Sequence, residues 1–455
     1  GGGVVTALSA INQYVPLTWV AAAMGEGDLR AAKSSDNGRI RNPLPGQNLD
    51  LRFVVLPKAV FHKYYNVFCN PLLWFLQHYM WNSPATPNIT AGTYDAWHSG
   101  YVAVNHAFAG AVMAEAGRHD APPFVMLHDY HLYLAAGEIR ERLPRAILQH
   151  FTHIPWPAPA YWQLLPRLMA RSICENLCAN DIVGMQTTAC VRNFLHTCET
   201  YLQDAEVDYR LGTIWRDGHL TRAKSYPISI DVDGLRQTIS GSAASHYVKE
   251  LAQVGGEKTI VRVDRMEPSK NIVRGFRAYE TLLHRFPEYH GKVKFLAFLV
   301  PSRTDLVEYR RYHKEVFRLA ASINARFGGE TWEPIKIYYE NNYVQALAGM
   351  KLADVLLVNP IVDGMNLVAK EGPIVSDGNL VLVLAEPAGA YDQLKDGVLP
   401  VAPADIEGTT QALRTALEMS SEERRSRLDL LRRSIEEEDL IMWLFHQLED
   451  LSKLA

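Results

Sequence analysis

The chain has 455 residues, of which 48% are hydrophobic and 21% are charged, and its formal net charge is -4. This length predicts two domains, and the composition is typical of a globular enzyme. The small net charge and the lack of a basic stripe argue against nucleic acid as a partner. No apolar run approaches the roughly 20 residues that cross a bilayer, and the first residues lack the basic start of a signal peptide. We therefore expect a cytoplasmic protein with small-molecule substrates and no membrane partner.

The chain opens on a glycine cluster, Gly1 to Gly3. A glycine turn that cradles phosphate normally follows a strand. We therefore expect that a first strand precedes the numbered residues and is missing from the N-terminal domain.

Short apolar runs rich in β-branched residues alternate with amphipathic helical stretches, which indicates parallel α/β architecture. Helices are predicted over IVRGFRAYETLLHRFP, ending at Pro287, and over SSEERRSRLDLLRRSIEEEDL, capped by Ser420 and Ser421. The predicted strands are FVML (124–127), AILQHF (146–151), TIVRV (259–263), KFLAFLV (294–300), VLLVN (355–359) and LVLVLA (380–385).

A domain boundary is predicted near residues 230–257, where Gly and Ser become frequent before a new strand begins. The expected fold class is α/β, with two doubly wound Rossmann-like domains facing a central cleft. The N-terminal domain would span residues 1–235 and the C-terminal domain residues 236–430. Residues 431–455 would form a helix that packs back on the N-terminal domain.

The cysteines do not indicate a metal site. Their number is five, which argues against a disulfide framework in a chain of this size. Most of them lie in one stretch without a CxxC pair, so buried helical thiols are favoured over zinc. That stretch contains Cys174, Cys178, Cys190 and Cys198.

HDYHL (128–132) and HFTHIPWP (150–157) each follow a predicted strand, so their polar side chains are expected at the ligand-facing edge of the sheet. No acidic or thiol ligand completes a metal set with these histidines. Hydrogen-bonding roles are therefore favoured for Asp129 and His153, with purely structural histidines as the alternative.

The run VRVDRMEPSKN places Arg265 and Lys270 just past the end of a strand. A fixed guanidinium beside an ammonium can stabilise the negative charge of a departing diphosphate without a metal. The alternative is a pair of ordinary surface cations.

In VLLVNPIVDGMNLVAKE a buried strand runs into a turn at Asp363 and Gly364 and then into a helix. Free amides at that helix start would form an anion site suited to a diphosphate. Glu371 could accept hydrogen bonds from ribose hydroxyls, and Asp363 from a sugar hydroxyl. An ordinary strand-turn-helix unit is the alternative. The amides belong to Met365, Asn366, Leu367 and Val368.

Together, HDYHL, HIPWP, the Arg and Lys of DRMEPSK, and DGMNLVAKE resemble the trehalose-6-phosphate synthases, retaining enzymes of GT-B fold in glycosyltransferase family 20. The resemblance covers nearly the whole chain. It implies transfer of glucose, with retention, from a nucleoside diphosphate glucose to glucose 6-phosphate, giving α,α-trehalose 6-phosphate. The nucleotide-sugar is then a substrate, and no cofactor or metal is implied. Residues 1–235 would bind the acceptor and residues 236–430 the nucleotide-sugar.

The resemblance also implies roles for single residues. Arg265 and Lys270 would bind the diphosphate, Asp363 would hold the donor glucose, and His153 would lie beside the transferred glucose, so these four are the catalytic candidates. The donor-binding candidates are Gly2, Gly3, Met365, Asn366, Leu367, Val368 and Glu371. The acceptor-binding candidates are Tyr65 and Trp74 of YYNVFCNPLLW, Asp129, and Arg303 of VPSRTD, which would clamp the phosphate. The arginine that the family carries on its first strand has no counterpart in the numbered chain.

Some segments depart from the common family pattern. VDRMEPSKN stands where many members carry ERLDYSKG, and YYENNYVQ differs from the usual uridine-type segment. HIPWPAPAYWQLLP is similar to a branch that includes the validoxylamine phosphate synthases, which use guanosine donors. This favours GDP-glucose over UDP-glucose.

Three alternatives stay open. The first is a pseudo-glycosyltransferase of the validoxylamine type, which forms a C–N bond. The others are a non-catalytic sugar-phosphate-binding homologue and a glucosylglycerol-phosphate synthase. Retention of DGMNLVAKE, HDYHL and Arg303 favours true glucosyl transfer. Family members often self-associate, and a homo-oligomer is also left open.

Overall fold

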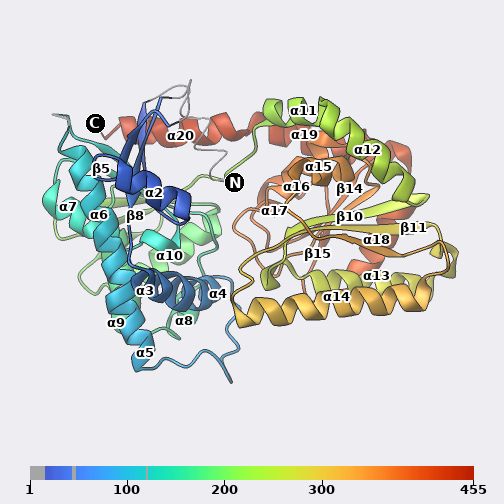
Figure 1. Ribbon diagram of the computed structural model, residues 1–455, viewed down its shortest axis with the longest axis horizontal. Helices are drawn as coiled ribbons and strands as arrows, with labels where there is room; N and C mark the ends of the chain where they lie inside the picture. The colour runs from blue at the N-terminus through green and yellow to red at the C-terminus, as the bar shows by residue number, and fades with distance from the viewer. Residues whose placement is uncertain (1–15, 44–47, 119–120, 455) are drawn as a thin grey trace. The chain divides into compact units, whose positions relative to one another are not determined.

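The computed structural model describes residues 16–43, 48–118 and 121–454, so the glycine cluster with Gly2 and Gly3 lies outside the described residues. The chain forms two compact units (Figure 1). It passes from the first unit to the second between Tyr226 and Pro227 and returns to the first between Trp443 and Leu444. Within the described ranges, no helix is long and apolar enough to span a membrane.

The first unit holds a six-stranded sheet in the order β4-β5-β6-β9-β8-β7. The pairs from β4 through β9 are parallel, whereas β8 pairs antiparallel with both β9 and β7. The carboxyl ends of β4 and β5 therefore lie at the same edge. The strands are β4 (Phe124–His128), β5 (Ile147–Thr152), β6 (Ile182–Met185), β7 (Glu206–Asp208), β8 (Thr213–Arg216) and β9 (His219–Ser225).

A smaller three-stranded sheet in the order β1-β3-β2 belongs to the same unit. Its strands are β1 (Leu17–Ala22), β2 (Arg39–Arg41) and β3 (Leu49–Val54). The helices of this unit are α2 (Glu26–Ser34), α3 (Lys58–Phe61), η1 (His62–Trp74), α4 (Phe75–Gln77), α5 (Ala91–Ala96), η2 (Trp97–Val102), α6 (Ala103–Ala116), η3 (Tyr130–Leu132), α7 (Ala135–Arg142), α8 (Pro159–Trp162), α9 (Arg167–Leu177) and α10 (Thr188–Tyr201).

The second unit is built on a six-stranded sheet in the order β12-β11-β10-β13-β14-β15, in which every pair is parallel. In Figure 1, α13, α14 and α18 lie on one face of this sheet, and α11, α12, α15 and α16 lie on the other. This is the doubly wound arrangement predicted from the sequence.

The strands of the second unit are β10 (Lys258–Arg265), β11 (Val293–Val300), β12 (Ile335–Tyr338), β13 (Val355–Val358), β14 (Val381–Ala385) and β15 (Leu399–Val401). Its helices are α11 (Val232–Ser240), α12 (Ser242–Val254), η4 (Pro268–Lys270), α13 (Ile272–Arg285), η5 (Pro287–Tyr289), α14 (Val307–Phe327), α15 (Tyr343–Lys351), α16 (Val368–Val375), α17 (Tyr391–Leu394), α18 (Ile406–Glu418) and α19 (Ser421–Glu437).

Local sequence explains the elements that were predicted. All the predicted apolar runs are strands, because continuous apolar side chains can be buried on both faces of a parallel sheet. The helix before Pro287 ends at Arg285, since proline disfavours a helical conformation in the residue before it. At α19 the Ser420 side chain accepts a hydrogen bond from the Glu423 amide over 3.2 Å, as predicted for a capping serine, whereas Ser421 is the first residue of the helix and does not cap it.

The glycine- and serine-rich stretch at 230–257 contains two helices, α11 and α12. Asp231 caps α11 by accepting a hydrogen bond from the Gly234 amide over 2.9 Å. Buried Leu235 and Leu251 give each helix an apolar face, and this outweighs the low helix propensity of Gly and Ser.

The last helix, α20 (Leu440–Ser452), contributes its residues from Leu444 onward to the first unit. Gln149 donates a hydrogen bond to Gln447 over 2.9 Å. Tyr226 donates to Asp450 over 2.8 Å, and Lys224 pairs with the same carboxylate over 2.7 Å. These polar contacts attach the end of the chain to strands β5 and β9 and the residue that follows β9.

Cys174 and Cys198 are buried in helices, as predicted for packed thiols. Cys190 lies in α10 but is partly exposed, and Cys178 is buried but follows the end of α9. The Sγ atoms of Cys178 and Cys198 are 3.8 Å apart. Burial raises the pKa of the Cys198 thiol well above its usual value, so this thiol stays protonated.

Candidate active site

The charged residues that were predicted to bind substrate in the second unit lie where the strands of its sheet end. Arg265 is the last residue of β10, and Lys270 ends the short helix η4 that follows. Arg303 comes after β11, and Asp363 comes after β13. Because β10, β11 and β13 are parallel, these residues share the ligand-facing edge of the sheet.

Lys270 and Asp363 form a closely spaced ion pair. The Asp363 carboxylate also accepts a hydrogen bond from the Asn366 side chain over 3.1 Å. Both partners of the ion pair are largely buried, so water screens the pair only partly. The predicted catalytic lysine and aspartate are thus held side by side.

Arg262 and Asp264 support this loop from within the sheet. The Arg262 guanidinium is fully buried, pairs with Asp264 over 2.7 Å, and donates to the Lys270 carbonyl over 2.9 Å. Burial raises the pKa of Asp264, although Arg262 and Lys270 act in the opposite direction. The backbone that carries Lys270 is therefore fixed by a buried ion pair.

Glu267 lies between the two predicted substrate-binding arginines. Its Oε1 atom is 3.0 Å from Nη1 of Arg265 and 3.8 Å from Nη1 of Arg303, and it accepts a hydrogen bond from the Ser302 hydroxyl over 2.8 Å. Arg303 has a φ of 43° and donates to the Tyr309 hydroxyl over 2.6 Å. The Arg265 side chain remains 54% exposed, which leaves it open to a ligand.

The turn before α16 presents unpaired amides. The helix begins at Val368, and Asn366 in the turn before it has a φ of 74°, close to the left-handed region that few residues other than glycine adopt. A β-carbon on Gly389 would lie 1.8 Å from the Gly364 carbonyl oxygen. The backbone at residue 389 therefore packs directly against this turn. Within the described part of the chain, the N–H groups of residues 365–368 have no hydrogen-bond acceptor. Together with the helix dipole they can bind an anion.

Glu371 lies one turn into α16. Its carboxylate accepts a hydrogen bond from the Tyr343 hydroxyl over 3.0 Å. Burial raises the pKa of Glu371 to about 7, although the bond from Tyr343 lowers it. This carboxyl group therefore changes its charge near neutral pH.

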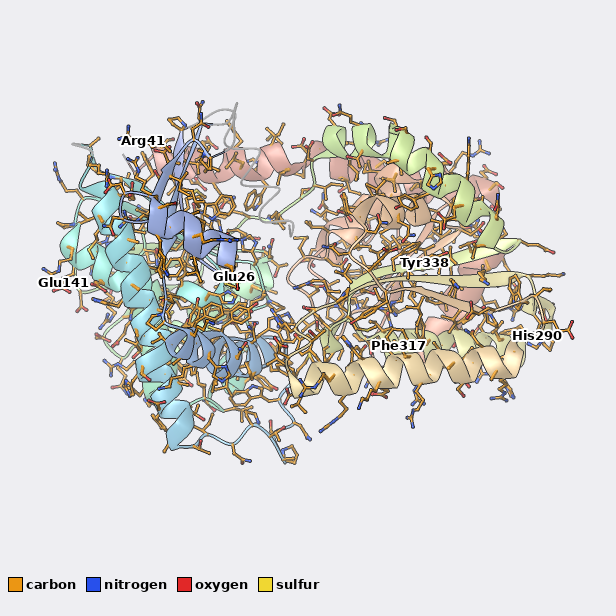
Figure 2. The ribbon with its side chains drawn as sticks, in the orientation of Figure 1. Glu26, Arg41, Glu141, His290, Phe317 and Tyr338 are labelled. Carbon is orange, nitrogen blue, oxygen red and sulfur yellow. The ribbon has the colours of Figure 1, made fainter. Side chains whose placement is uncertain are left out.

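Aromatic side chains contact the segment that differs from the uridine-type pattern. It begins at Tyr338, labelled in Figure 2, where β12 ends. The Tyr338 ring stacks on Phe298 with a centroid distance of 4.9 Å and an interplanar angle of 8°. Asn342 caps α15 and donates to the Tyr247 hydroxyl over 2.9 Å. The start of α15, with Tyr343, is therefore fixed in place.

In the first unit the structure brings Asp129 and His153 together. Asp129 follows β4 and has a φ of 66°, an uncommon conformation for a residue other than glycine. Its carboxylate accepts a hydrogen bond from the His153 amide over 3.2 Å, and its own amide donates to the Phe151 carbonyl over 2.7 Å. Residues held in such uncommon backbone conformations cluster at functional sites.

The histidines beside Asp129 are half-buried and uncharged. Nδ1 of His128 and Nε2 of His153 are 3.2 Å apart. Burial lowers the pKa of His128 to about 4 and that of His153 well below its usual value. Among residues 16–43, 48–118 and 121–454, no group of His, Cys, Asp or Glu side chains has the arrangement of a metal site. Neutral His153 is suited to hydrogen bonding with a sugar hydroxyl.

The two aromatic acceptor candidates lie on η1 and differ in exposure. Tyr65 is partly exposed, and its ring stacks on Phe61 and His131 with centroid distances of 5.3 and 5.8 Å. Trp74 is 1% exposed and stacks on His78 at 4.1 Å, so its indole is part of the core. The remaining acceptor candidate, Arg303, belongs to the second unit.

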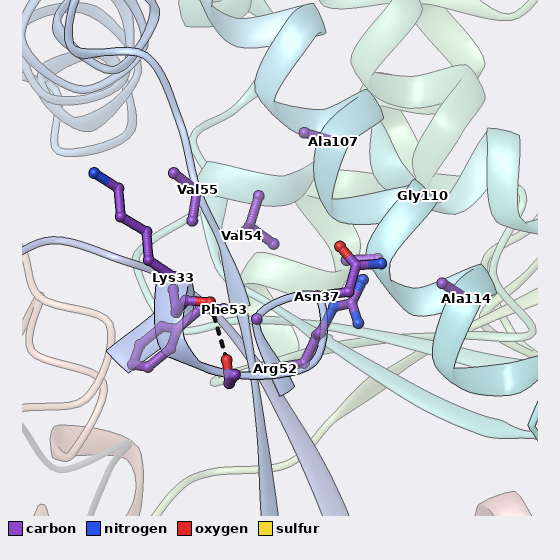
Figure 3. Close-up of a pocket in the computed structure, with 13 residues that line it drawn as sticks. Lys33, Asn37, Arg52, Phe53, Val54, Val55, Ala107, Gly110 and Ala114 are labelled. Atoms are coloured by element: carbon purple, nitrogen blue, oxygen red, sulfur yellow. Dashed lines mark hydrogen bonds between the residues drawn. The ribbon is translucent and has the colours of Figure 1, made fainter. Parts of the chain in front are cut away.

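A cavity of about 610 Å³ lies in the first unit (Figure 3). Its polar lining comes from Lys33, Ser35, Asn37 and Arg52, and small residues of α6 form its opposite wall. None of the residues predicted to bind substrate is among those that line it.

Sequence reasoning missed two residues that hold the site in place, Glu267 and Tyr343. Glu267 lies two positions after Arg265 in DRMEPSK, and an acidic residue so close to a predicted substrate-binding arginine could have indicated an ion pair between them. Tyr343 gave no such signal, because its contact with Glu371 joins residues that are 28 positions apart.

Comparison with known proteins identifies the family. A family model described as glycosyltransferase family 20 matches residues 1–453. The chain is 32% identical over 398 residues to a protein of Klebsiella pneumoniae subsp. pneumoniae named trehalose-6-phosphate synthase, covering 86% of this chain and 80% of that protein.

Solved structures are similar over the whole chain. One, described as trehalose-6-phosphate from E. coli bound with UDP-2-fluoro glucose, has a TM-score of 0.87 at 27% identity and covers 100% of this chain and 97% of that chain. Another is an alpha,alpha-trehalose-phosphate synthase (UDP-forming) from Burkholderia xenovorans in complex with glucose-6-phosphate. It has a TM-score of 0.86 at 27% identity and covers 99% of this chain and 96% of that chain. The predicted α/β fold of GT-B type is confirmed, and the chain belongs to glycosyltransferase family 20.

Proposed function

We propose that this glycosyltransferase moves glucose from a nucleoside diphosphate glucose to glucose 6-phosphate with retention, forming α,α-trehalose 6-phosphate. The observation that carries the proposal is the cluster at the sheet edge of the second unit. There, an open Arg265 and the Lys270–Asp363 ion pair share the edge with the unpaired amides of residues 365–368. The similar proteins whose names state this activity, and the relative that binds glucose-6-phosphate, support the choice of reaction.

In the proposed reaction the bond between the anomeric carbon and the diphosphate oxygen breaks, and a bond from that carbon to the acceptor hydroxyl oxygen forms on the same face. The departing phosphate oxygen takes the proton of the acceptor hydroxyl. Arg265 and Lys270 stabilise the charge that develops on the diphosphate, and the amides of residues 365–368 add further donors. Few side chains need to react, because positioning and charge stabilisation lower the barrier.

Other residues would position the two sugars. Asp363 holds hydroxyls of the donor glucose, and its ion pair with Lys270 fixes its orientation. Neutral His153 binds the transferred glucose, while Asp129 and Tyr65 contact the acceptor sugar and Arg303 its phosphate. Trp74 would support the acceptor segment from the core.

The base of the donor is a separate part of the proposal. The sequence favours GDP-glucose through HIPWPAPAYWQLLP and YYENNYVQ, whereas the relative from Burkholderia xenovorans is UDP-forming. Glu371 would bind the ribose in either case, and the base would lie near the start of α15. No cofactor is included in the proposal. A cytoplasmic location stays a prediction from the sequence, and a homo-oligomer stays open.

The test is nucleotide release on incubation with glucose 6-phosphate and, in separate reactions, GDP-glucose, UDP-glucose and ADP-glucose. Release that depends on glucose 6-phosphate supports the reaction, and the donor with the largest kcat/KM gives the base. Tight nucleotide binding without release would instead favour the pseudo-glycosyltransferase or the non-catalytic homologue.

A further inference from the structure

Glu267 has an unusual environment for a carboxylate. Its side chain is fully buried. Its Oε1 atom accepts a hydrogen bond from Ser302 and forms ion pairs with Arg265 and, over a longer distance, Arg303. The other oxygen, Oε2, is buried without a hydrogen-bond partner among the described residues. Since an unpaired buried acceptor costs free energy, retaining a carboxylate here needs a compensating reason.

The charges around Glu267 keep it ionised. Burial by itself would raise the pKa of this carboxyl group, but Arg265, Arg303 and Lys270 outweigh that effect, and its pKa is lowered. The negative charge is therefore present throughout the neutral range, together with at least two guanidinium groups that share one oxygen atom.

The two arginines differ in what they have besides Glu267. Arg265 is 54% exposed, and Glu267 is the one ion-pair partner that the described residues give it. Arg303 is 13% exposed and also donates to Tyr309. A long, exposed arginine side chain loses rotamer entropy when it binds a ligand, so a partner that restrains it in advance improves binding.

We propose that Glu267 is a positioning residue shared by the two substrate-binding guanidinium groups, holding Arg265 for the donor diphosphate and Arg303 for the acceptor phosphate. This inference rests on the proposed function, which assigns these two arginines to different substrates. One buried carboxylate then sets the distance between the donor and acceptor cations. Its loss disturbs the binding of both substrates, although Glu267 itself contacts neither.

The decisive variant is Glu267→Gln, which keeps the shape of the side chain and removes its charge. We expect the Michaelis constants for the nucleotide-sugar and for glucose 6-phosphate both to rise about tenfold, the scale of one lost charge-assisted hydrogen bond on each arginine. A purely structural role would reduce the amount of active enzyme and leave both Michaelis constants unchanged. Glu267→Asp keeps the charge on a shorter side chain and should give intermediate values.

Two further variants keep the test decisive. Ser302→Ala removes the hydroxyl that donates to the same Oε1 atom, and it should raise both Michaelis constants by a smaller factor even if Glu267→Gln does not fold. Glu407→Gln is the matched control, because it removes an exposed carboxylate that pairs with Arg285 over 2.5 Å, and both constants should stay at wild-type values.

Some results would overturn the inference and leave the proposed function intact. In that case the wild-type enzyme is active, Arg265→Ala weakens donor binding, and Arg303→Ala weakens acceptor binding, but the Glu267 and Ser302 variants change only one Michaelis constant or neither. If the wild-type protein transfers no glucose to glucose 6-phosphate, the proposed function itself fails.

Discussion

The Tyr343 hydroxyl lies 3.0 Å from the Glu371 carboxylate and donates a hydrogen bond to it. Burial raises the pKa of Glu371 from 4.5 to about 7. A raised carboxyl pKa means that the protonated form dominates below about pH 7 and the carboxylate dominates above it. If Glu371 accepts hydrogen bonds from the ribose, nucleotide affinity should therefore increase as the pH rises through 7.

This pH dependence can be measured by isothermal titration calorimetry of UDP and GDP between pH 6 and pH 8. The Tyr343→Phe variant removes the hydrogen bond that stabilises the carboxylate, so the midpoint should move to higher pH. Glu371→Gln should bind more weakly and without this transition. A wild-type affinity that is constant over the range would show that Glu371 does not contact the ribose in its ionised form.

Arg265→Ala and Lys270→Ala should each lower kcat at least about a hundredfold, the scale expected when a preorganised charge stabiliser is lost. The matched control is Arg285→Ala, which removes an exposed arginine that pairs with Glu407 on the surface of the same unit. Steady-state kinetics at saturating substrates make the comparison. Wild-type turnover in either site variant would show that the donor diphosphate does not bind at this edge of the sheet.

Arg303→Ala should raise the Michaelis constant for glucose 6-phosphate far more than that for the nucleotide-sugar, because its guanidinium is assigned to the acceptor phosphate. Glucose without phosphate provides a second measurement, since it should be used equally poorly by the wild-type enzyme and the variant. Equal effects of the substitution on both Michaelis constants would assign Arg303 to another role.

Gly389→Ala should destabilise the protein by about 1–3 kcal/mol, the usual cost of overpacking, because the added carbon would lie 1.8 Å from the Gly364 carbonyl oxygen. The displaced turn carries Asp363, so turnover of the folded variant should fall as well. Urea denaturation and kinetics test both effects. Gly329→Ala is the control, since a β-carbon there meets nothing within 4 Å. If stability and turnover are unchanged in both variants, the turn can shift to make room for the added carbon.

The sequence predicted strands that are continuous apolar runs rich in β-branched residues, such as KFLAFLV and LVLVLA, because such side chains can be buried on both faces of a parallel sheet. It did not predict β1, β3, β6, β8, β9, β12 or β15, and it also missed two short polar strands, β2, with the sequence RIR, and β7, with EVD. Such short polar segments become strands through pairing with a neighbour, and that pairing cannot be read from their own residues.

The same distinction holds for the candidate site. Arg265, Lys270 and Asp363 could be placed together because each follows a predicted strand of a parallel sheet. The contact of Glu267 with Arg303 depends on β10 lying beside β11, and that of Tyr343 with Glu371 depends on how α15 packs on α16. Contacts of this kind join residues far apart in the chain, so spacing in the sequence does not reveal them.

The first measurement to make is identification of the product formed from a nucleoside diphosphate glucose and glucose 6-phosphate, by mass and by NMR of the anomeric protons. We predict a disaccharide phosphate in which both anomeric centres are α, formed by the wild-type protein and almost abolished in Arg265→Ala. A β-linked product, or release of free glucose without transfer to glucose 6-phosphate, would contradict retaining synthesis of trehalose 6-phosphate.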